Sequence, residues 1–296
     1  MCGLAGVILK QKDRDNEALN RVSESFIRML TEADMRGGHA TGFALIDKYG
    51  DYVICKKPKD AYMFFEDSEV KDNVNLVYNG ITCLMGHTRY ATLGSPSINK
   101  NNHPIRTGQT IGTHNGSISN HKELFYKYDM ERFAQVDSEA IFRLYETSSG
   151  IDDFLNNRLP KVKGRVAIVW ADLERPDYIY MVKANNPIQM VYIPEHDCYA
   201  YGSTDSIINE GFWGDYERIT IEPNTMVRIN TKTLKIDTQK IKIAKSKVKK
   251  FSFYDERIGA YKDEEETIPN FVPRFSYSDQ LKLFKAKDGS TIRKVK

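Results

Sequence analysis

The chain opens with Met1-Cys2-Gly3-Leu4-Ala5-Gly6-Val7-Ile8-Leu9 (MCGLAGVIL), an apolar run that predicts a buried strand starting at the terminus itself. Because cysteine is small enough to permit removal of Met1, we expect the mature chain to begin at Cys2. Such a residue carries a thiol nucleophile together with a free α-amine of pKa about 8, so it needs no separate histidine as base. Taken alone, however, Cys2-Gly3 is more often a buried structural cysteine.

The segments that follow the first strand alternate between helical and extended patterns. Apolar residues at helical spacing predict a helix near 15–34, and a Gly50-Asp51 turn joins two short strands into a hairpin. The predicted elements of this half are strands 2–9, 41–47, 52–56 and 81–89 and helices near 15–34 and 60–78. A loop rich in Gly, Pro, Ser and Asn then extends to about 108.

The second half of the chain begins with a strand at 110–115, which ends in the turn signal Asn115-Gly116. A helix is predicted near 120–130, with Asn120 as its N-cap and Glu123 in the capping-box position. Another helix opens at Asp137-Ser138-Glu139. Strands are then predicted at 164–171, 177–183, 188–193, 198–202, 217–221, 225–230 and 233–238. Two helical blocks therefore flank two groups of strands, which favours α/β layers without a βαβ repeat.

Five motifs follow one another in a fixed order along this pattern: Met1-Cys2-Gly3-Leu4-Ala5-Gly6-Val7, Arg36-Gly37-Gly38-His39-Ala40-Thr41-Gly42, Gly86-His87-Thr88-Arg89-Tyr90-Ala91-Thr92-Leu93-Gly94, His114-Asn115-Gly116 and Asp137-Ser138-Glu139. Together with His103-Pro104, they resemble the glutaminase domain of class II glutamine amidotransferases. That family includes glucosamine-6-phosphate synthase and amidophosphoribosyltransferase. The resemblance covers roughly residues 2–240, and five motifs in order are far more specific than any one of them.

The resemblance implies an α+β fold, the four-layer αββα sandwich of N-terminal nucleophile hydrolases, with a short C-terminal appendage. It implies that Cys2 attacks the side-chain amide of L-glutamine. The tetrahedral oxyanion formed by that attack needs positioned donors, which in the family pattern are the Asn115 side chain and the Gly116 backbone N–H. No cofactor and no metal are implied. An isolated Asn115-Gly116 pair would instead be read as a plain turn.

The glutamine α-carboxylate and α-ammonium each require a partner of opposite charge. A guanidinium binds a carboxylate in bidentate fashion, and Arg89 occupies that family position, with Thr92 on the same loop. Asp137 occupies the position that receives the ammonium. The alternative for Asp137 is a helix N-cap, and both roles are compatible.

The sequence departs from the family pattern at two places. Gly38-His39 stands where the family has an aromatic residue or Gln followed by Asp, and Leu93 stands where one branch has His and another a small residue. Both departures concern loop details and Arg36. His87, His114 and His121 lie inside family segments, but we expect structural roles for them because the α-amine already supplies the base.

Composition and charge describe an ordinary globular protein. Of 296 residues, 41% are hydrophobic and 28% are charged, and the net charge of +3 does not indicate a nucleic-acid binder. The four cysteines, Cys2, Cys55, Cys83 and Cys198, lack CxxC spacing, so no zinc site is predicted. Neither a signal peptide nor a membrane span is indicated. We therefore expect a cytoplasmic protein without a membrane partner.

The C-terminal part differs in character, so we predict domains at 2–240 and 241–296. Residues 240–296 hold 15 Lys and Arg against 8 Asp and Glu, whereas the rest of the chain is net acidic. The sequence contains no GxxxxGK[ST] motif for an ATP-driven synthetase.

Three functions stay open. The favoured one is a glutaminase subunit that passes ammonia to a separate synthase subunit. The others are a stand-alone amidohydrolase acting on glutamine or a γ-glutamyl compound, and a non-catalytic module that uses the basic tail. Nucleic acid is a less favoured partner for that tail.

Overall fold

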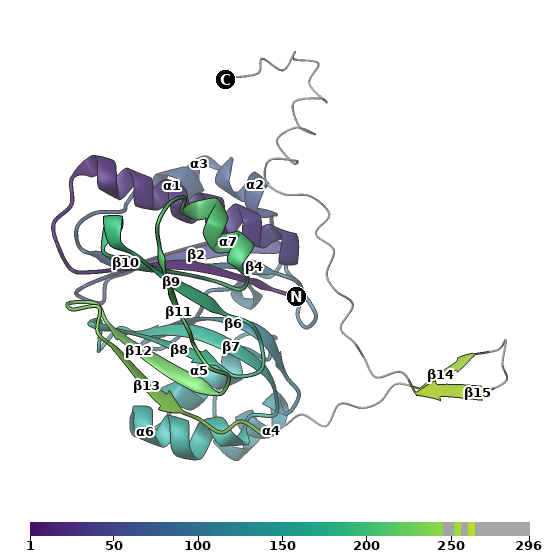
Figure 1. Ribbon diagram of the computed structural model, residues 1–296. Helices are drawn as coiled ribbons and strands as arrows, with labels where there is room; N and C mark the ends of the chain where they lie inside the picture. The colour runs from purple at the N-terminus through teal and green to yellow at the C-terminus, as the bar shows by residue number, and fades with distance from the viewer. Residues whose placement is uncertain (245–251, 256–259, 264–296) are drawn as a thin grey trace, which may run out of the picture. The chain divides into compact units, whose positions relative to one another are not determined.

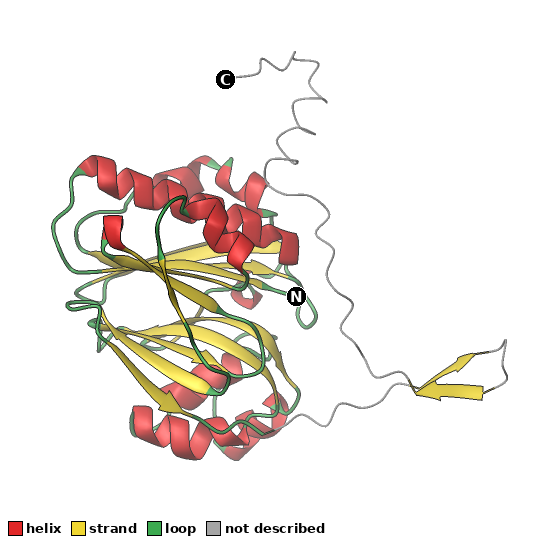
Figure 2. Ribbon diagram, in the orientation of Figure 1, coloured by secondary structure: helices red, strands yellow, loops and turns green. Residues whose placement is uncertain are grey.

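The structure is a computed structural model, and it describes residues 1–244, 252–255 and 260–263. Residues 1–244 form one compact unit. Figure 1 shows this unit as two stacked sheets with helices on both outer faces, and Figure 2 shows the same layers by secondary structure. The predicted four-layer αββα sandwich is therefore confirmed.

The first sheet has seven strands in the order β11-β9-β10-β1-β4-β2-β3, and its registered pairs are antiparallel. Its strands are β1 (Gly3–Leu9), β2 (Ala40–Asp47), β3 (Tyr52–Lys57), β4 (Ile81–Arg89), β9 (Gln189–Ile193), β10 (Cys198–Gly202) and β11 (Glu217–Ile219). The outer face of this sheet is covered by α1 (Asn16–Ala33), α2 (Ala61–Phe65), α3 (Ser68–Val74) and α7 (Asp205–Gly211). The nucleophile strand β1 thus lies at the centre of its sheet.

The second sheet has six antiparallel strands in the order β13-β12-β8-β7-β6-β5. They are β5 (Ile105–Thr107), β6 (Thr110–Ile118), β7 (Gly164–Asp172), β8 (Tyr178–Lys183), β12 (Thr225–Asn230) and β13 (Ile236–Lys240). Its outer face carries α4 (His121–Lys127), α5 (Glu139–Glu146) and α6 (Ile151–Asp153), which continues into the irregular turns 154–161. The two remaining strands, β14 (Ser252–Asp255) and β15 (Ala260–Asp263), pair as a hairpin in a second unit.

Three apolar clusters lie between the four layers, and β1 contributes to two of them. Ala5, Val7 and Leu9 pack toward the helices, whereas Leu4 and Ile8 pack between the sheets. This alternation is the period of two expected for a strand, and it explains why a strand buried on both faces is apolar throughout. The third cluster lies between the second sheet and α5, around Trp170.

The structure corrects one local prediction. Asn120 does precede α4, but its side chain makes no capping bond. Its amide instead donates to the Lys161 carbonyl at 2.9 Å, and its amide oxygen accepts from the Lys163 N–H at 2.9 Å. Asn120 therefore occupies the predicted N-cap position, but the predicted capping hydrogen bond is wrong. Its side chain instead joins α4 to the segment that enters β7. Helix α7 was not predicted at all.

The predicted boundary at residue 240 is followed by residues that belong to the core. Ile241 is buried and packs in the same cluster as Trp170. Among the described residues, none of the helices combines the length and the apolar character needed to span a bilayer. Most of the predicted basic extension, including 245–250 and 264–296, lies outside the described residues.

Candidate active site

Cys2 lies at the start of β1 and is held through its backbone. The Arg36 Nε–H donates to the Cys2 carbonyl at 3.1 Å, and the Cys2 thiol lies 3.8 Å from the Tyr90 carbonyl. Gly3 permits this close approach of strands and helix, because a Cβ there would lie 2.5 Å from the Ala33 carbonyl oxygen. The Cys2 carbonyl and the Cys2 thiol are thus each held by a contact to another segment.

The electrostatic environment of the terminus favours an uncharged amine. Burial lowers the pKa of the Met1 amine below its usual value, and the nearby charges of Arg36 and Arg165 lower it further. Burial also raises the pKa of the Cys2 thiol above its usual value. Loss of Met1 would place the free amine on Cys2 itself, on the same residue as the thiol, where it can act as the base.

All six residues predicted as site residues line one cavity of about 420 Å³. They come from four separate parts of the sequence, and they are Cys2, Arg89, Thr92, Asn115, Gly116 and Asp137. Their spatial convergence is a fact of the fold, whereas their individual roles stay predictions. Among the described residues, no group of three or more His, Cys, Asp or Glu is placed to hold a metal ion.

Asn115 and Gly116 lie in β6, in the sheet that faces the nucleophile strand. Asn115 is 1% exposed, and its Nδ2 lies 3.4 Å from the Ser203 hydroxyl as a donor. Only glycine fits at position 116, because a Cβ there would lie 1.8 Å from the Arg165 carbonyl oxygen. The close packing of β6 on β7 therefore requires Gly116 independently of any chemistry.

Arg89 ends β4, and its guanidinium is already engaged. Its Nη1 donates to Asn102 Oδ1 at 2.8 Å, and its Nη2 donates to the carbonyls of Leu93 and Gly94 at 2.6 and 2.7 Å. Both forks of a guanidinium include Nη2, so a bidentate carboxylate would have to displace these loop carbonyls. Arg89 thus organises the loop that carries Thr92 and Leu93.

We predict that Arg89→Lys raises the KM for glutamine about tenfold or more and lowers kcat less, because lysine keeps the charge but loses the planar fork. Asn102→Ala is the matched control, because it removes the Nη1 contact and two further loop contacts but leaves the guanidinium in place; it should raise KM less. Steady-state kinetics on both variants measure the split. A fall in kcat with unchanged KM for Arg89→Lys would show that Arg89 does not hold the substrate carboxylate.

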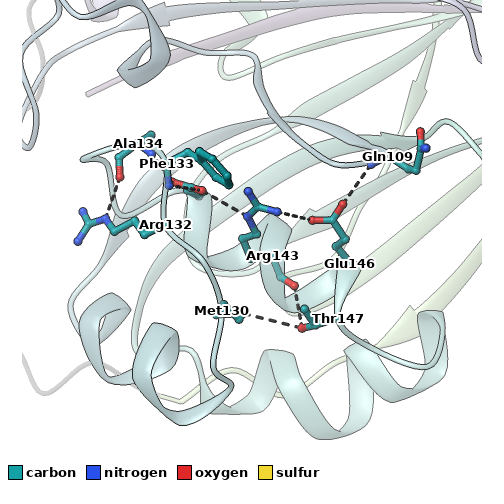
Figure 3. Close-up of polar contacts among 9 residues, drawn as sticks. Gln109, Met130, Arg132, Phe133, Ala134, Arg143, Glu146 and Thr147 are labelled. Atoms are coloured by element: carbon teal, nitrogen blue, oxygen red, sulfur yellow. Dashed lines mark hydrogen bonds and ion pairs between the residues drawn. The ribbon is translucent and has the colours of Figure 1, made fainter.

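The loop that leads into Asp137 is held by Glu139, the third residue of the same motif. Glu139 is 1% exposed, and its carboxylate accepts from the Phe133 N–H and the Ala134 N–H. Arg143 pairs with Glu139 and with Glu146. Figure 3 shows Arg143 between the 133–134 backbone and Glu146, which in turn accepts from the Gln109 N–H at 3.1 Å. This buried network fixes the segment that leads into Asp137.

The Asp137 carboxylate itself accepts from the Ile118 N–H, while Ser138 occupies the N-cap position of α5. The carboxylate therefore joins β6 to the loop before α5, and at the same time it lines the cavity. The helix-cap alternative considered from the sequence does not describe Asp137, because the cap position belongs to its neighbour.

Of the motif histidines, His103 lines the cavity, whereas His87 and His114 do not. His114 bonds to the Ser138 hydroxyl through Nδ1 at 2.8 Å and to the Arg165 carbonyl through Nε2 at 3.1 Å. His87 bonds to the His114 carbonyl, and burial lowers its pKa to about 3. His103 stacks on His87 at 4.1 Å between ring centroids and also lines the cavity. These contacts link the two sheets and the cavity wall through neutral rings.

His39 stands at the family's Asp position and has a contact that the sequence did not indicate. Its Nδ1 accepts from the Ala91 N–H at 3.0 Å, and its ring stacks on Tyr90 at 5.0 Å. The exposed His39 therefore anchors the start of the loop that follows Arg89. Sequence reasoning also missed Ser203 and Asn186, since neither lies in a recognised motif.

No protein-family model matches the sequence. A glutamine–fructose-6-phosphate aminotransferase (isomerizing) from Geobacillus kaustophilus is 28% identical over 247 residues, which cover 79% of this chain and 38% of the relative. A 7-cyano-7-deazaguanine synthase 2 from Sulfurisphaera tokodaii is 23% identical over 255 residues, or 84% of this chain and 52% of the relative. Glutamine phosphoribosylpyrophosphate amidotransferase from B. subtilis, solved with ADP and GMP, superposes with a TM-score of 0.62 at 18% identity. That superposition covers 81% of this chain and 49% of the other.

The chain has the fold of a class II glutaminase domain. The resemblance read from the five motifs is confirmed by these relatives and by the superposition. The chain spans about half the length, or less, of the relatives it matches. The identities and coverages show the fold of this chain, and they leave its activity, substrate and partner to be proposed.

Proposed function

We propose that this protein hydrolyses the side-chain amide of L-glutamine through a thioester on Cys2 and supplies the ammonia to a synthase. The observation that carries the proposal is the convergence of Cys2, Asn115 and Gly116 on the same cavity as Arg89 and Asp137. Release of ammonia from the side-chain amide of a free amino acid needs three things: a nucleophile that attacks the amide carbon, donors for the oxyanion, and charged groups that bind the α-carboxylate and the α-ammonium.

The chemistry proceeds in two steps on this arrangement. The α-amine takes the proton of the Cys2 thiol as sulfur attacks the amide carbon, and the carbonyl oxygen becomes an oxyanion facing Asn115 and Gly116. The protonated amine then gives its proton to the leaving nitrogen, so ammonia departs and a thioester forms. Water, deprotonated by the same amine, hydrolyses the thioester to glutamate and frees the thiol.

The proposal requires a free amine on Cys2, so activity should follow the fraction of chains that lack Met1. Intact-mass measurement gives that fraction, and release of ammonia and glutamate from L-glutamine gives the activity. Treatment of a Met1-retaining preparation with methionine aminopeptidase should raise the fraction of chains that lack Met1, and the glutaminase activity should rise in proportion. Full activity in a preparation that keeps Met1 would sink the amine-as-base mechanism, and no activity in either would sink the glutaminase proposal.

We propose further that the ammonia acceptor is a separate synthase subunit. The two relatives are an aminotransferase and a synthase. A stand-alone amidohydrolase on glutamine or a γ-glutamyl compound is the alternative enzyme, and it would show full activity without a partner. A non-catalytic module would show none. A cytoplasmic location also stays a proposal.

The basic extension is the proposed partner-binding segment. Because Ile241 packs in the core, a truncation should end after Ala244, which is later than the boundary predicted from the sequence. We expect the 1–244 chain to keep basal glutamine hydrolysis and to lose association with the synthase. Saturable, salt-weakened binding of an acidic protein by the full chain supports the proposal, whereas steep sequence-independent binding to nucleic acid indicates the less favoured partner. A folded 1–244 chain without hydrolysis would show that the extension completes the site.

A further inference from the structure

The two oxyanion donors of the proposed glutaminase must be aimed at one point to be useful. One donor is a side-chain N–H of Asn115, and the other is the backbone N–H of Gly116. A donor that is free to rotate loses much of its effect, because preorganisation is the source of the stabilisation. The question is therefore which residues hold the Asn115 carboxamide and the Asn115–Gly116 peptide in place.

Ser203 contacts the carboxamide from the opposite sheet. It is fully buried after β10, and its hydroxyl accepts from the Leu4 N–H at 2.9 Å while its own N–H donates to the Leu4 carbonyl at 3.0 Å. The same hydroxyl oxygen lies 3.4 Å from Asn115 Nδ2. Ser203 thus ties the nucleophile strand to the oxyanion donor through one atom.

This contact sets the direction of the second N–H of Asn115. The two N–H groups of a carboxamide are coplanar, so an acceptor for one determines where the other points. A separation of 3.4 Å is long for such a bond, but hydrogen bonds in unliganded sites commonly tighten when substrate binds.

Asn186 holds the other donor through the peptide group. It lies after β8, is 7% exposed and lines the cavity, and its Nδ2 donates to the Asn115 carbonyl at 2.9 Å. In a trans peptide the C=O and the following N–H point in opposite directions. Fixing the Asn115 carbonyl therefore fixes the Gly116 N–H.

The residue before Asn186 makes the support rigid. Asn185 accepts from the Val166 N–H at 2.8 Å and donates to the Gly164 carbonyl at 2.9 Å. The consecutive asparagines therefore bind β7 with one side chain and β6 with the next. Because glycine at 116 has no side chain to restrict its own backbone, the bond from Asn186 to the Asn115 carbonyl limits rotation of the peptide group that carries the Gly116 N–H.

We propose that Ser203 and Asn186 are positioning residues of the oxyanion hole, a role that rests on the proposed glutaminase function. Ser203 acts through the Asn115 carboxamide, and Asn186 acts through the Gly116 N–H. Neither needs to touch the reacting atoms. The competing explanation is that both residues only satisfy buried backbone groups and so contribute to stability alone.

Single variants separate the two explanations by the parameter that changes. Ser203→Ala and Asn186→Ala should each lower kcat for glutamine hydrolysis about tenfold while KM changes less than about twofold, because the lost interaction matters only as charge develops. Ser206→Ala, which changes an exposed serine in the first turn of α7, is the control and should leave kcat unchanged. Since Ser203→Ala leaves the Leu4 N–H unbonded, Ser203→Cys serves as a conservative variant and should recover part of kcat.

A double-mutant cycle then tests through which donor each residue acts. In an Asn115→Ala background, Ser203→Ala should produce no further fall in kcat, because the group it orients is gone. Asn186→Ala should still lower kcat about tenfold in that background, since the Gly116 N–H is intact. An equal fall from Ser203→Ala in both backgrounds, or a change confined to thermal stability, would overturn the assignment.

A spectroscopic measurement decides the positioning even if the protein hydrolyses no glutamine. The Asn115 side-chain amide signals of ¹⁵N-labelled protein are identified by their absence from Asn115→Ala. They should shift and exchange faster with solvent in Ser203→Ala, and the Gly116 amide signal should shift in Asn186→Ala. Unmoved signals in both variants overturn the inference, whereas absent ammonia release with moved signals overturns only the glutaminase function.

Discussion

Replacement of Cys2 by alanine should abolish release of ammonia from glutamine, with kcat falling to the background of the assay. The thiol forms the covalent bond on which both chemical steps depend, and the cavity contains no second cysteine among its lining residues. Ammonia and glutamate should be measured together on protein whose Met1 removal has been checked by mass. Because Cys2 lies at the end of a strand and is partly exposed, the change should leave the melting temperature nearly unaltered.

Labelling by a glutamine-like diazoketone provides the matched test of the nucleophile. Cys55, Cys83 and Cys198 are buried, and burial raises the pKa of the Cys55 thiol to about 11 and that of Cys198 to about 12. None of these three thiols lines the cavity, so a reagent that binds there as glutamine does should modify only Cys2. Alanine at each of the three buried positions should preserve labelling. Modification mainly at one of them would refute Cys2 as the nucleophile.

Replacement of Asn115 by alanine should lower kcat about 10²-fold or more with a much smaller change in KM, because a donor used only as the oxyanion develops is lost. Steady-state kinetics of glutamine hydrolysis measure the two parameters separately. Asn115→Asp is an informative companion, since its carboxylate has the same shape but carries negative charge toward the oxyanion, and it should be at least as inactive.

A rise in KM in place of the fall in kcat would change the role assigned to Asn115. If Asn115→Ala chiefly raised KM while Arg89→Lys chiefly lowered kcat, the oxyanion donor and the substrate clamp would have been exchanged. Asn101→Ala controls for general damage to the site: this fully buried asparagine braces the loops after Arg89 and before Asp137, yet it does not line the cavity. We expect a lower melting temperature from it without the selective loss of kcat.

Periodic segments were readily predicted, and short or irregular ones were not. The hairpin predicted at 41–47 and 52–56 is found as β2 and β3, and the helix predicted near 15–34 is found as α1. Strong apolar patterns over many residues determine these elements. By contrast, α7 is a short helix whose buried residues Ile207 and Ile208 belong to the cluster that includes α1, a helix far away in the sequence. Asn120 shows the same limit, because its side chain bonds to a distant segment in place of its own helix.

The sequence by itself determined the long strands and helices, and its five motifs, through the family that they resemble, pointed to the four layers and to the six residues that meet at the cavity. Periodicity, turn chemistry and motifs are local properties, so they can be read without knowing which segments touch. Only the tertiary structure decided that Arg89 is bound to its own loop, that Glu139 fixes the approach to Asp137, and that Ser203 and Asn186 support the oxyanion donors. The contacts of Arg89 and Glu139 lie within single loops, whereas those of Ser203 and Asn186 join residues far apart in the sequence. The Asn115–Ser203 contact also joins the two sheets. No pattern along one strand specifies them, because their geometry depends on how the sheets are stacked.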